Sequence, residues 1–122
     1  MDAGARLVNA TNGATLATTV ERAETAWRRF VGLMGRKALP QGHCLVIPGC
    51  GSIHMCFMRF AIDVLFLDTA HRVRALRHGL KPWRLASGGW GYRDTVELPA
   101  GTLAATGTAL DHIVQIQMGV SP

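Results

Sequence analysis

The apolar run at residues 64–67 constrains the fold more than any other feature of this chain. Its residues are Val, Leu, Phe and Leu, apolar at every position rather than at every second one. This pattern is typical of a strand that is buried on both faces of a sheet. A histidine, a cysteine, an arginine and two aspartates surround the run within residues 53–68. The sequence therefore predicts a central strand with chemically active side chains close to its start.

Short apolar segments separated by turn residues fill most of the remaining chain. Asn12-Gly13, between residues 7–10 and 14–20, predicts a hairpin because both residues tolerate the positive φ of a tight turn. Further strands are expected at residues 43–47, 64–67, 73–77, 92–98 and 113–117. Since few helices separate the strands, the pattern favours an α+β fold over βαβ units. We expect a small antiparallel-rich rolled sheet or β-barrel of about seven short strands.

One main helix is predicted at about residues 25–34. Four residues spaced i, i+3, i+4 and i+7 form its apolar face: Trp27, Phe30, Val31 and Met34. Thr25 is the expected N-cap, and Gly35 is expected just after the C-terminal end. Residues 102–106 are expected to add a single helical turn. Residues 80–84 are expected to be extended, because the residue before a proline avoids the helical region.

Length and composition predict one folded domain, residues 1–122. A chain of 122 residues can bury a core without disulfides or a structural metal. Its apolar runs all fall short of the roughly 20 residues that a membrane helix needs. The N-terminal charges are not followed by the apolar stretch of a signal peptide. We therefore expect a cytoplasmic location, with the export of a longer precursor left open.

The net charge of +5 raises the question of an anionic partner. Nucleic acid, phosphate and carboxylate ligands would all suit a basic chain. The arginines are dispersed, however, and no run of them exceeds Arg28-Arg29. This dispersal argues against nucleic acid and leaves a small polar or anionic molecule as the expected partner.

Five residues are the candidates for a ligand pocket: His54, Arg59, Asp63, Trp83 and Arg84. They are polar or aromatic side chains that flank the most apolar strand, as expected of a pocket with a few convergent polar groups. Trp83 would offer a flat surface beside the planar guanidinium of Arg84. Asp63 has two readings, a ligand contact or a buried ion pair or hydrogen bond that anchors the start of the strand.

Two other functions compete with ligand binding. The first is a hydrolase-like enzyme in which His54 acts with Asp63 or Cys56. The second is an accessory domain that docks on a protein partner through Trp90, inside a glycine-rich loop. The three cysteines, at 44, 50 and 56, are not spaced like the ligand pairs of zinc sites. We therefore expect neither a metal nor a cofactor.

Several blocks of sequence occur in an order that resembles one known family. The blocks are Gly32-Leu33-Met34-Gly35-Arg36, Ile53-His54, residues 58–68, Pro82-Trp83-Arg84 and Glu97-Leu98-Pro99-Ala100-Gly101-Thr102. Together they resemble the bacterial and archaeal family catalogued as domain of unknown function 192, from about residue 20 to residue 117. The resemblance implies a compact domain with a small barrel-like sheet and a helix, and it implies no established activity.

The chain also departs from the family's pattern. Met55 and Phe57 stand where smaller or polar residues are usual, and their bulk would narrow a pocket beside His54. Ala61 replaces a usual proline, and Leu110 replaces a usual glycine. In the last block, Glu97 is the member expected to face a site.

Overall fold

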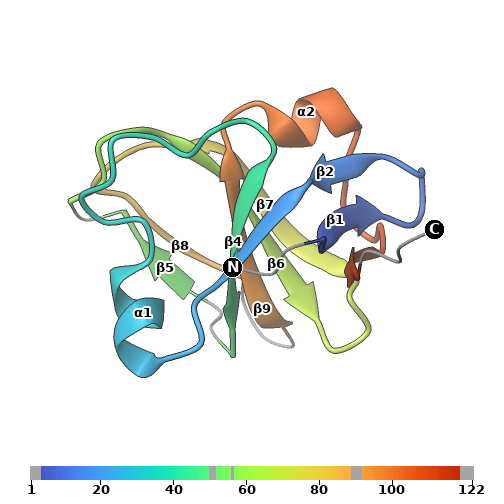
Figure 1. Ribbon diagram of the computed structural model, residues 1–122, viewed down its shortest axis with the longest axis horizontal. Helices are drawn as coiled ribbons and strands as arrows, with labels where there is room; N and C mark the ends of the chain where they lie inside the picture. The colour runs from blue at the N-terminus through green and yellow to red at the C-terminus, as the bar shows by residue number, and fades with distance from the viewer. Residues whose placement is uncertain (1–3, 50–51, 56, 89–91, 119–122) are drawn as a thin grey trace.

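The computed structural model describes residues 4–49, 52–55, 57–88 and 92–118 (Figure 1). Within them the strands are β1 (Arg6–Asn9), β2 (Thr15–Ala17), β3 (Thr19–Arg22), β4 (His43–Pro48), β5 (Ser52–His54), β6 (Ile62–Asp68), β7 (Val73–Leu80), β8 (Leu85–Ser87), β9 (Tyr92–Pro99) and β10 (Val114–Gln117). The helices are α1 (Ala26–Val31) and α2 (Thr102–Thr106). Neither described helix has the length and apolar character needed to cross a membrane.

The described strands form three sheets. The largest has the order β3-β4-β9-β6-β7, and the others have the orders β10-β1-β2 and β5-β8. Only β3 and β4 pair in parallel among the recorded strand pairs. The α+β, antiparallel-rich fold is therefore confirmed, but the described strands do not close into a barrel. Thr18 bends the chain between β2 and β3, so the two strands enter different sheets instead of continuing one.

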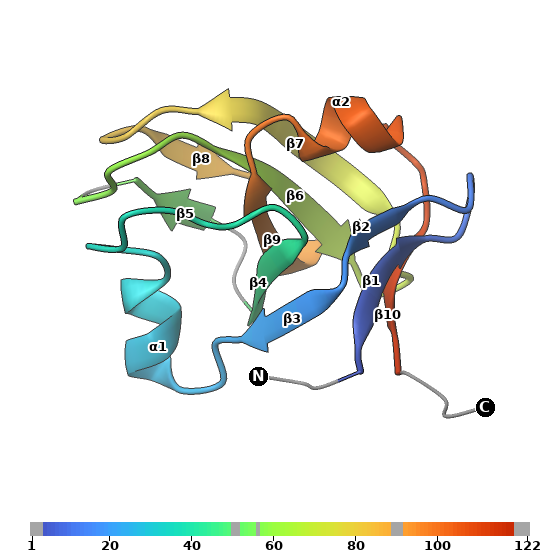
Figure 2. The ribbon, with the colours of Figure 1, turned by 45° about the horizontal axis from the view of Figure 1, so that its top comes forward.

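Two apolar cores cover the two faces of the five-stranded sheet. Leu65 and Val96 belong to the first core, together with side chains from β1, β2, β10 and α2. Val64 and Phe66 belong to the second core, with Leu33 after α1 and side chains near β5 and β8. Figure 2 shows the sheet between these two sets of elements. Residues 64–67 are buried on both faces, which confirms the predicted central strand.

The main helix is shorter than expected. Its predicted cap is confirmed, because the Thr25 hydroxyl accepts a hydrogen bond from Arg28 N–H at 3.0 Å. The helix stops at Val31, because Gly32 has φ 52° and ψ −122°, a conformation that only glycine adopts readily. The predicted apolar face is wrong at Trp27, whose side chain is 71% exposed.

The other local predictions divide between the two ends of the molecule. The opening hairpin is confirmed, with β1 antiparallel to β2 and Gly13 at φ 81°. The single helical turn at residues 102–106 is also confirmed. The extended segment at residues 80–84 is wrong at Trp83, which has φ 68° and lies in a turn. Local sequence did not reveal this turn because it depends on hydrogen bonds to the distant residue Met55.

Candidate functional site

Asp63 connects the start of β6 to β7 and to the start of α2 through the hydrogen bonds of its carboxylate. Its side chain is 1% exposed, and its carboxylate accepts hydrogen bonds from the backbone N–H groups of Gly79 at 2.8 Å, Gly101 at 3.1 Å and Leu103 at 2.9 Å. A buried carboxylate is stable when such donors replace its water. The observed bonds match the structural reading of Asp63, in which it anchors the start of β6.

The other predicted residues lie around β5 and β8. His54 is half-buried and pairs with Leu85 across these strands. Met55 N–H donates to Arg84 O at 2.7 Å, and Trp83 N–H donates to Met55 O at 2.8 Å. The structure thus brings Trp83 and Arg84 to the strand that carries His54. Trp83, Arg84 and Arg59 are exposed, so a ligand pocket formed by all five candidates stays a prediction.

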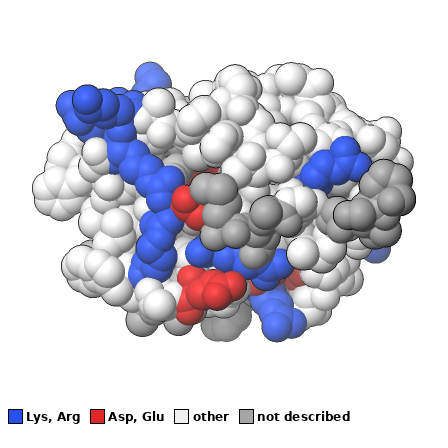
Figure 3. Space-filling view, in the orientation of Figure 1, with Lys and Arg blue, Asp and Glu red and all other residues white. Residues whose placement is uncertain are grey.

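A charged cluster lies where α1 meets the end of β3. Arg36 Nη2 donates to Glu21 Oε2 at 2.5 Å, and Arg28 forms an ion pair with the same oxygen. Burial raises the pKa of Glu21, but hydrogen bonds and charge from Arg36 and Arg28 outweigh this and hold it below its usual value. Figure 3 shows Lys and Arg side chains in a band over the loop after α1, with acidic side chains beside them.

Glu97 is a second carboxylate near the same arginines. It is 3% exposed, and a Cβ added to Gly32 would lie 3.2 Å from its Oε1. Burial raises its pKa to about 7, and the charges of Arg36 and Arg28 offset only part of that rise. Glu97 can therefore gain or lose a proton near neutral pH. From sequence, Glu97 was the member of its block expected to face a site. In the structure it lies against Gly32, which belongs to another block of the same family resemblance.

The cysteine chemistry considered for this chain is only partly within the described residues. Cys44 is buried in the first core, and burial raises the pKa of its thiol to about 12. It is therefore protonated at neutral pH and a poor nucleophile. Cys50, Cys56 and Trp90 lie outside the described residues. Among the residues described, no group of three His, Cys, Asp or Glu side chains could hold a metal ion.

A cleft of about 700 Å³ opens beside the first core, and none of its described lining residues belongs to β5 or β8. Side chains of the first core form its apolar wall: Leu7, Val46, Leu67, Val96, Val114 and Ile116. Its polar lining includes Arg22 at the end of β3, Arg93 in β9 and His71 in the turn between β6 and β7. Asp94 also lines it, and its carboxylate accepts a hydrogen bond from Gly49 N–H at 3.3 Å.

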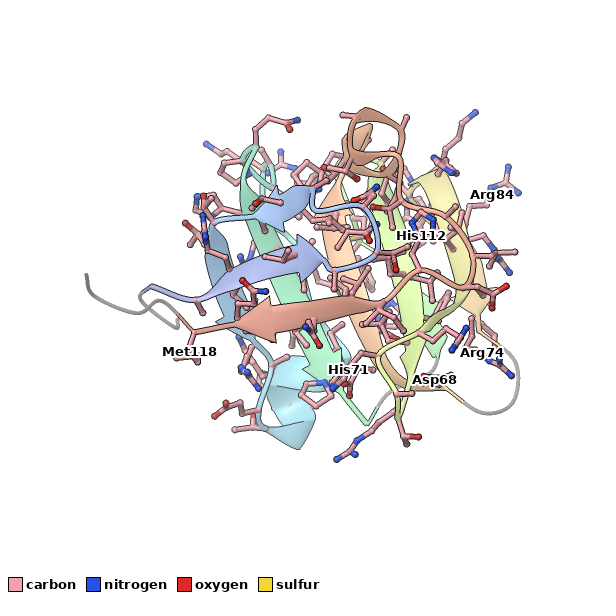
Figure 4. The ribbon with its side chains drawn as sticks, turned by 90° about the vertical axis from the view of Figure 1, so that its right-hand side faces the viewer. Asp68, His71, Arg74, Arg84, His112 and Met118 are labelled. Carbon is pink, nitrogen blue, oxygen red and sulfur yellow. The ribbon has the colours of Figure 1, made fainter. Side chains whose placement is uncertain are left out.

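The turn that carries His71 is held in place by Asp68. The Asp68 carboxylate accepts hydrogen bonds from Ala70 N–H at 2.9 Å and Arg72 N–H at 3.0 Å. Burial raises the pKa of Asp68, but these bonds and the charges of Arg74 and Arg72 lower it below its usual value. Val114 N–H donates to His71 O at 2.9 Å, which connects the turn to β10. Figure 4 shows His71 next to β10, with Asp68 and Arg74 on the far side of the turn.

The cleft combines an apolar wall with two guanidinium groups and an imidazole. Pockets of this volume and character accept small molecules, with the polar groups setting their orientation. Guanidinium groups favour carboxylate or phosphate. None of the cleft residues was a candidate from sequence. They come from separate strands and one turn, and no local spacing relates Arg22 to Arg93.

Comparisons with known proteins agree with the resemblance in the sequence. The family model of DUF192, described as an uncharacterized ACR, matches residues 7–116. A UPF0127 protein of Thermococcus sibiricus is 32% identical over 124 residues, covering 95% of this chain and 80% of that protein. A UPF0127 protein of Thermococcus kodakarensis is 34% identical over 101 residues, covering 80% of this chain and 64% of that protein.

Two solved structures share the fold. A protein of unknown function from Novosphingobium aromaticivorans has a TM-score of 0.78 at 17% identity, covering 91% of this chain and 82% of that one. A protein titled a putative transcription regulator, from Sinorhizobium meliloti, has a TM-score of 0.77 at 23% identity, covering 91% and 90%. At these identities the likeness concerns the fold alone.

Proposed function

The chain belongs to the DUF192 family, and we propose that it binds a small amphipathic anion in the cleft lined by Arg22, His71 and Arg93. The ligand carries a carboxylate or a similar anionic group on an apolar body. The observation behind the proposal is the composition of the cleft, whose lining combines apolar side chains with cationic and hydrogen-bonding ones around a space of about 700 Å³.

Each part of the cleft has a separate task in this proposal. The wall formed by the first core excludes water from the apolar body of the ligand. This burial contributes about 25 cal/mol of binding free energy per Å² of apolar surface. Arg22 and Arg93 contact the anionic group from β3 and β9, the strands on either side of β4. Asp94 turns toward Gly49 N–H, and this hydrogen bond reduces its repulsion of an anion.

Three simple compounds test separately whether binding needs the apolar body and whether it needs the anionic group. Octanoate has both an apolar chain and a carboxylate, 1-octanol has only the chain, and acetate has only the charge. Octanoate at ten times its Kd should raise the melting temperature by roughly 3–6 °C. Neither 1-octanol nor acetate should do so at equal concentration. Isothermal titration calorimetry then measures the stoichiometry, which should be one.

Matched double variants locate the site. R22A/R93A should lose the shift produced by octanoate, whereas R59A/R84A, which removes two arginines near β5 and β8, should keep it. Equal shifts in the two variants, or equal shifts with octanoate and 1-octanol, would contradict an anion site in the cleft. Circular dichroism of both variants checks that they fold.

A further inference from the structure

Three large apolar side chains are exposed together where the β5 and β8 segments meet. We define them as the aromatic patch: Phe57, Trp83 and Leu85, with exposed fractions of 63%, 62% and 76%. The rings of Phe57 and Trp83 contact each other, with centroids 5.0 Å apart and planes tilted by 60°. Side chains exposed this far do not line a groove. They project from the surface, and an apolar group of this kind marks an interaction site.

The backbone holds the two rings outward at a cost. Phe57 and Trp83 have φ of 62° and 68°, a left-handed conformation that is unfavourable for residues other than glycine. Such strain persists where surrounding bonds determine it. Here Trp83 N–H donates to Met55 O at 2.8 Å, and Gly35 N–H donates to Phe57 O at 3.2 Å. The two turns lie at the same end of the molecule, at the left of Figures 1 and 2.

Basic side chains accompany the patch. Arg59, Lys81 and Arg84 are exposed within two residues of its members along the chain. Residues 57–62 and 77–88 contain no aspartate or glutamate. The aromatic patch therefore combines apolar side chains with positive charge that no acidic residue in these two segments offsets.

We propose that the aromatic patch is a docking surface for an anionic lipid bilayer. Trp and Phe suit the boundary between head groups and acyl chains, where an apolar ring meets a wet layer. Lys and Arg side chains near an anionic bilayer are attracted to its negative surface. The flat surface of a bilayer can accept side chains that project from turns. A peptide partner would instead need a groove in which to lie. Docking of a second copy is disfavoured, because it would bring two basic surfaces together.

Vesicle co-sedimentation of the full chain tests this proposal. Vesicles of phosphatidylcholine and phosphatidylglycerol in equal amounts should bind the protein, whereas phosphatidylcholine alone should bind it at least about tenfold more weakly. F57S/W83S should lower binding to the mixed vesicles at least about tenfold. The single variant L85S, at the most exposed position of the patch, should lower it by a smaller factor. Both changes replace exposed side chains, and circular dichroism checks folding.

Charge-matched variants separate a docking surface from general attraction between a basic protein and an anionic membrane. R59E/R84E and R22E/R93E change the net charge equally. If the aromatic patch is the docking surface, vesicle binding must fall much further in R59E/R84E. Equal losses in the two variants would overturn the proposal, as would unchanged binding by both F57S/W83S and L85S. Absence of binding to the mixed vesicles would also overturn it, and patch-dependent binding of polyglutamate in that case would identify a protein-docking surface instead.

Discussion

Two buried carboxylates on neighbouring strands differ in the groups that solvate them, because they lie on opposite faces of the sheet. Asp63 in β6 lies opposite Leu98, and Glu97 in β9 lies opposite Val64. Both are nearly inaccessible, at 1% and 3% exposure. Asp63 reaches the start of α2 and accepts three backbone hydrogen bonds. Glu97 lies against Gly32 after α1, near the charges of Arg36 and Arg28.

The comparison shows that proximity of donors matters more than the presence of positive charge. Backbone N–H groups bonded directly to a carboxylate replace its water. Arg28 and Arg36 both form ion pairs with Glu21. Because they are already paired, they replace the lost water of Glu97 only in part. We therefore expect Asp63 to stabilise the fold through its bonds, and the ionised form of Glu97 to destabilise it.

The largest expected effect is that of Asp63→Ala. The variant leaves the N–H groups of Gly79, Gly101 and Leu103 without their acceptor. Leu103 N–H is buried, and the other two donors are partly buried. Each unsatisfied buried donor costs about 1–3 kcal/mol, so the free energy of unfolding should fall by about 3 kcal/mol. Urea denaturation measures this, and Asp63→Asn, which keeps one acceptor oxygen, should lose less. A loss below about 1 kcal/mol for the alanine variant would contradict the claim that the hydrogen bonds of Asp63 stabilise the fold.

Glu97→Gln should have the next largest effect, with the opposite sign at high pH. The folded-state pKa of Glu97, about 7, lies above its ordinary value of 4.5. The folded state therefore holds the proton more tightly than the unfolded state does. The stability that protonation provides is complete below pH 4.5 and is lost as the pH rises through 7. At pH 8 the variant should be more stable than the wild type, by on the order of 2 kcal/mol.

Denaturation curves between pH 5 and 8 check this expectation for Glu97. The advantage of Glu97→Gln should shrink as the pH falls, because the wild-type carboxyl is then neutral too. Glu24→Gln, at an exposed carboxylate, serves as the control and should show no such advantage. If Glu97→Gln destabilised the protein at pH 8, the carboxylate would have to be better solvated than its surroundings indicate.

Gly32→Ala should have an effect similar in size to that of Glu97→Gln at pH 8, and it tests the account of the second face. The combination of φ 52° and ψ −122° lies outside the left-handed helical region and costs an alanine about 1–3 kcal/mol. The added Cβ would also lie 3.2 Å from Glu97 Oε1, which must move. Urea denaturation should show a loss of about 2 kcal/mol. Gly35→Ala, which shares the positive φ but meets nothing within 4 Å, isolates the conformational part, and equal losses would show that the contact is unimportant.

Much of the secondary structure could be predicted because its signals are local. Period and turn residues located β4, β6, β9 and the hairpin of β1 with β2. The length of α1 was overestimated, because the apolar spacing continued past Gly32 while its backbone could not continue the helix. The turn at Trp83 could not be predicted, since its N–H bonds to Met55 in a distant segment. The candidate pocket had the same difficulty, because Asp63 bonds to backbone groups that no pattern identifies.

The amino-acid sequence by itself determined that residues 64–67 form a strand buried on both faces, because an unbroken apolar run of this length must avoid water on either side. It also determined the α+β class and the family. Only the tertiary structure decided which buried carboxylate receives backbone hydrogen bonds and which remains under-solvated. It also decided that Arg22, His71 and Arg93 share one cleft. These outcomes depend on contacts between distant segments, and those contacts exist only once the two faces of the sheet are covered.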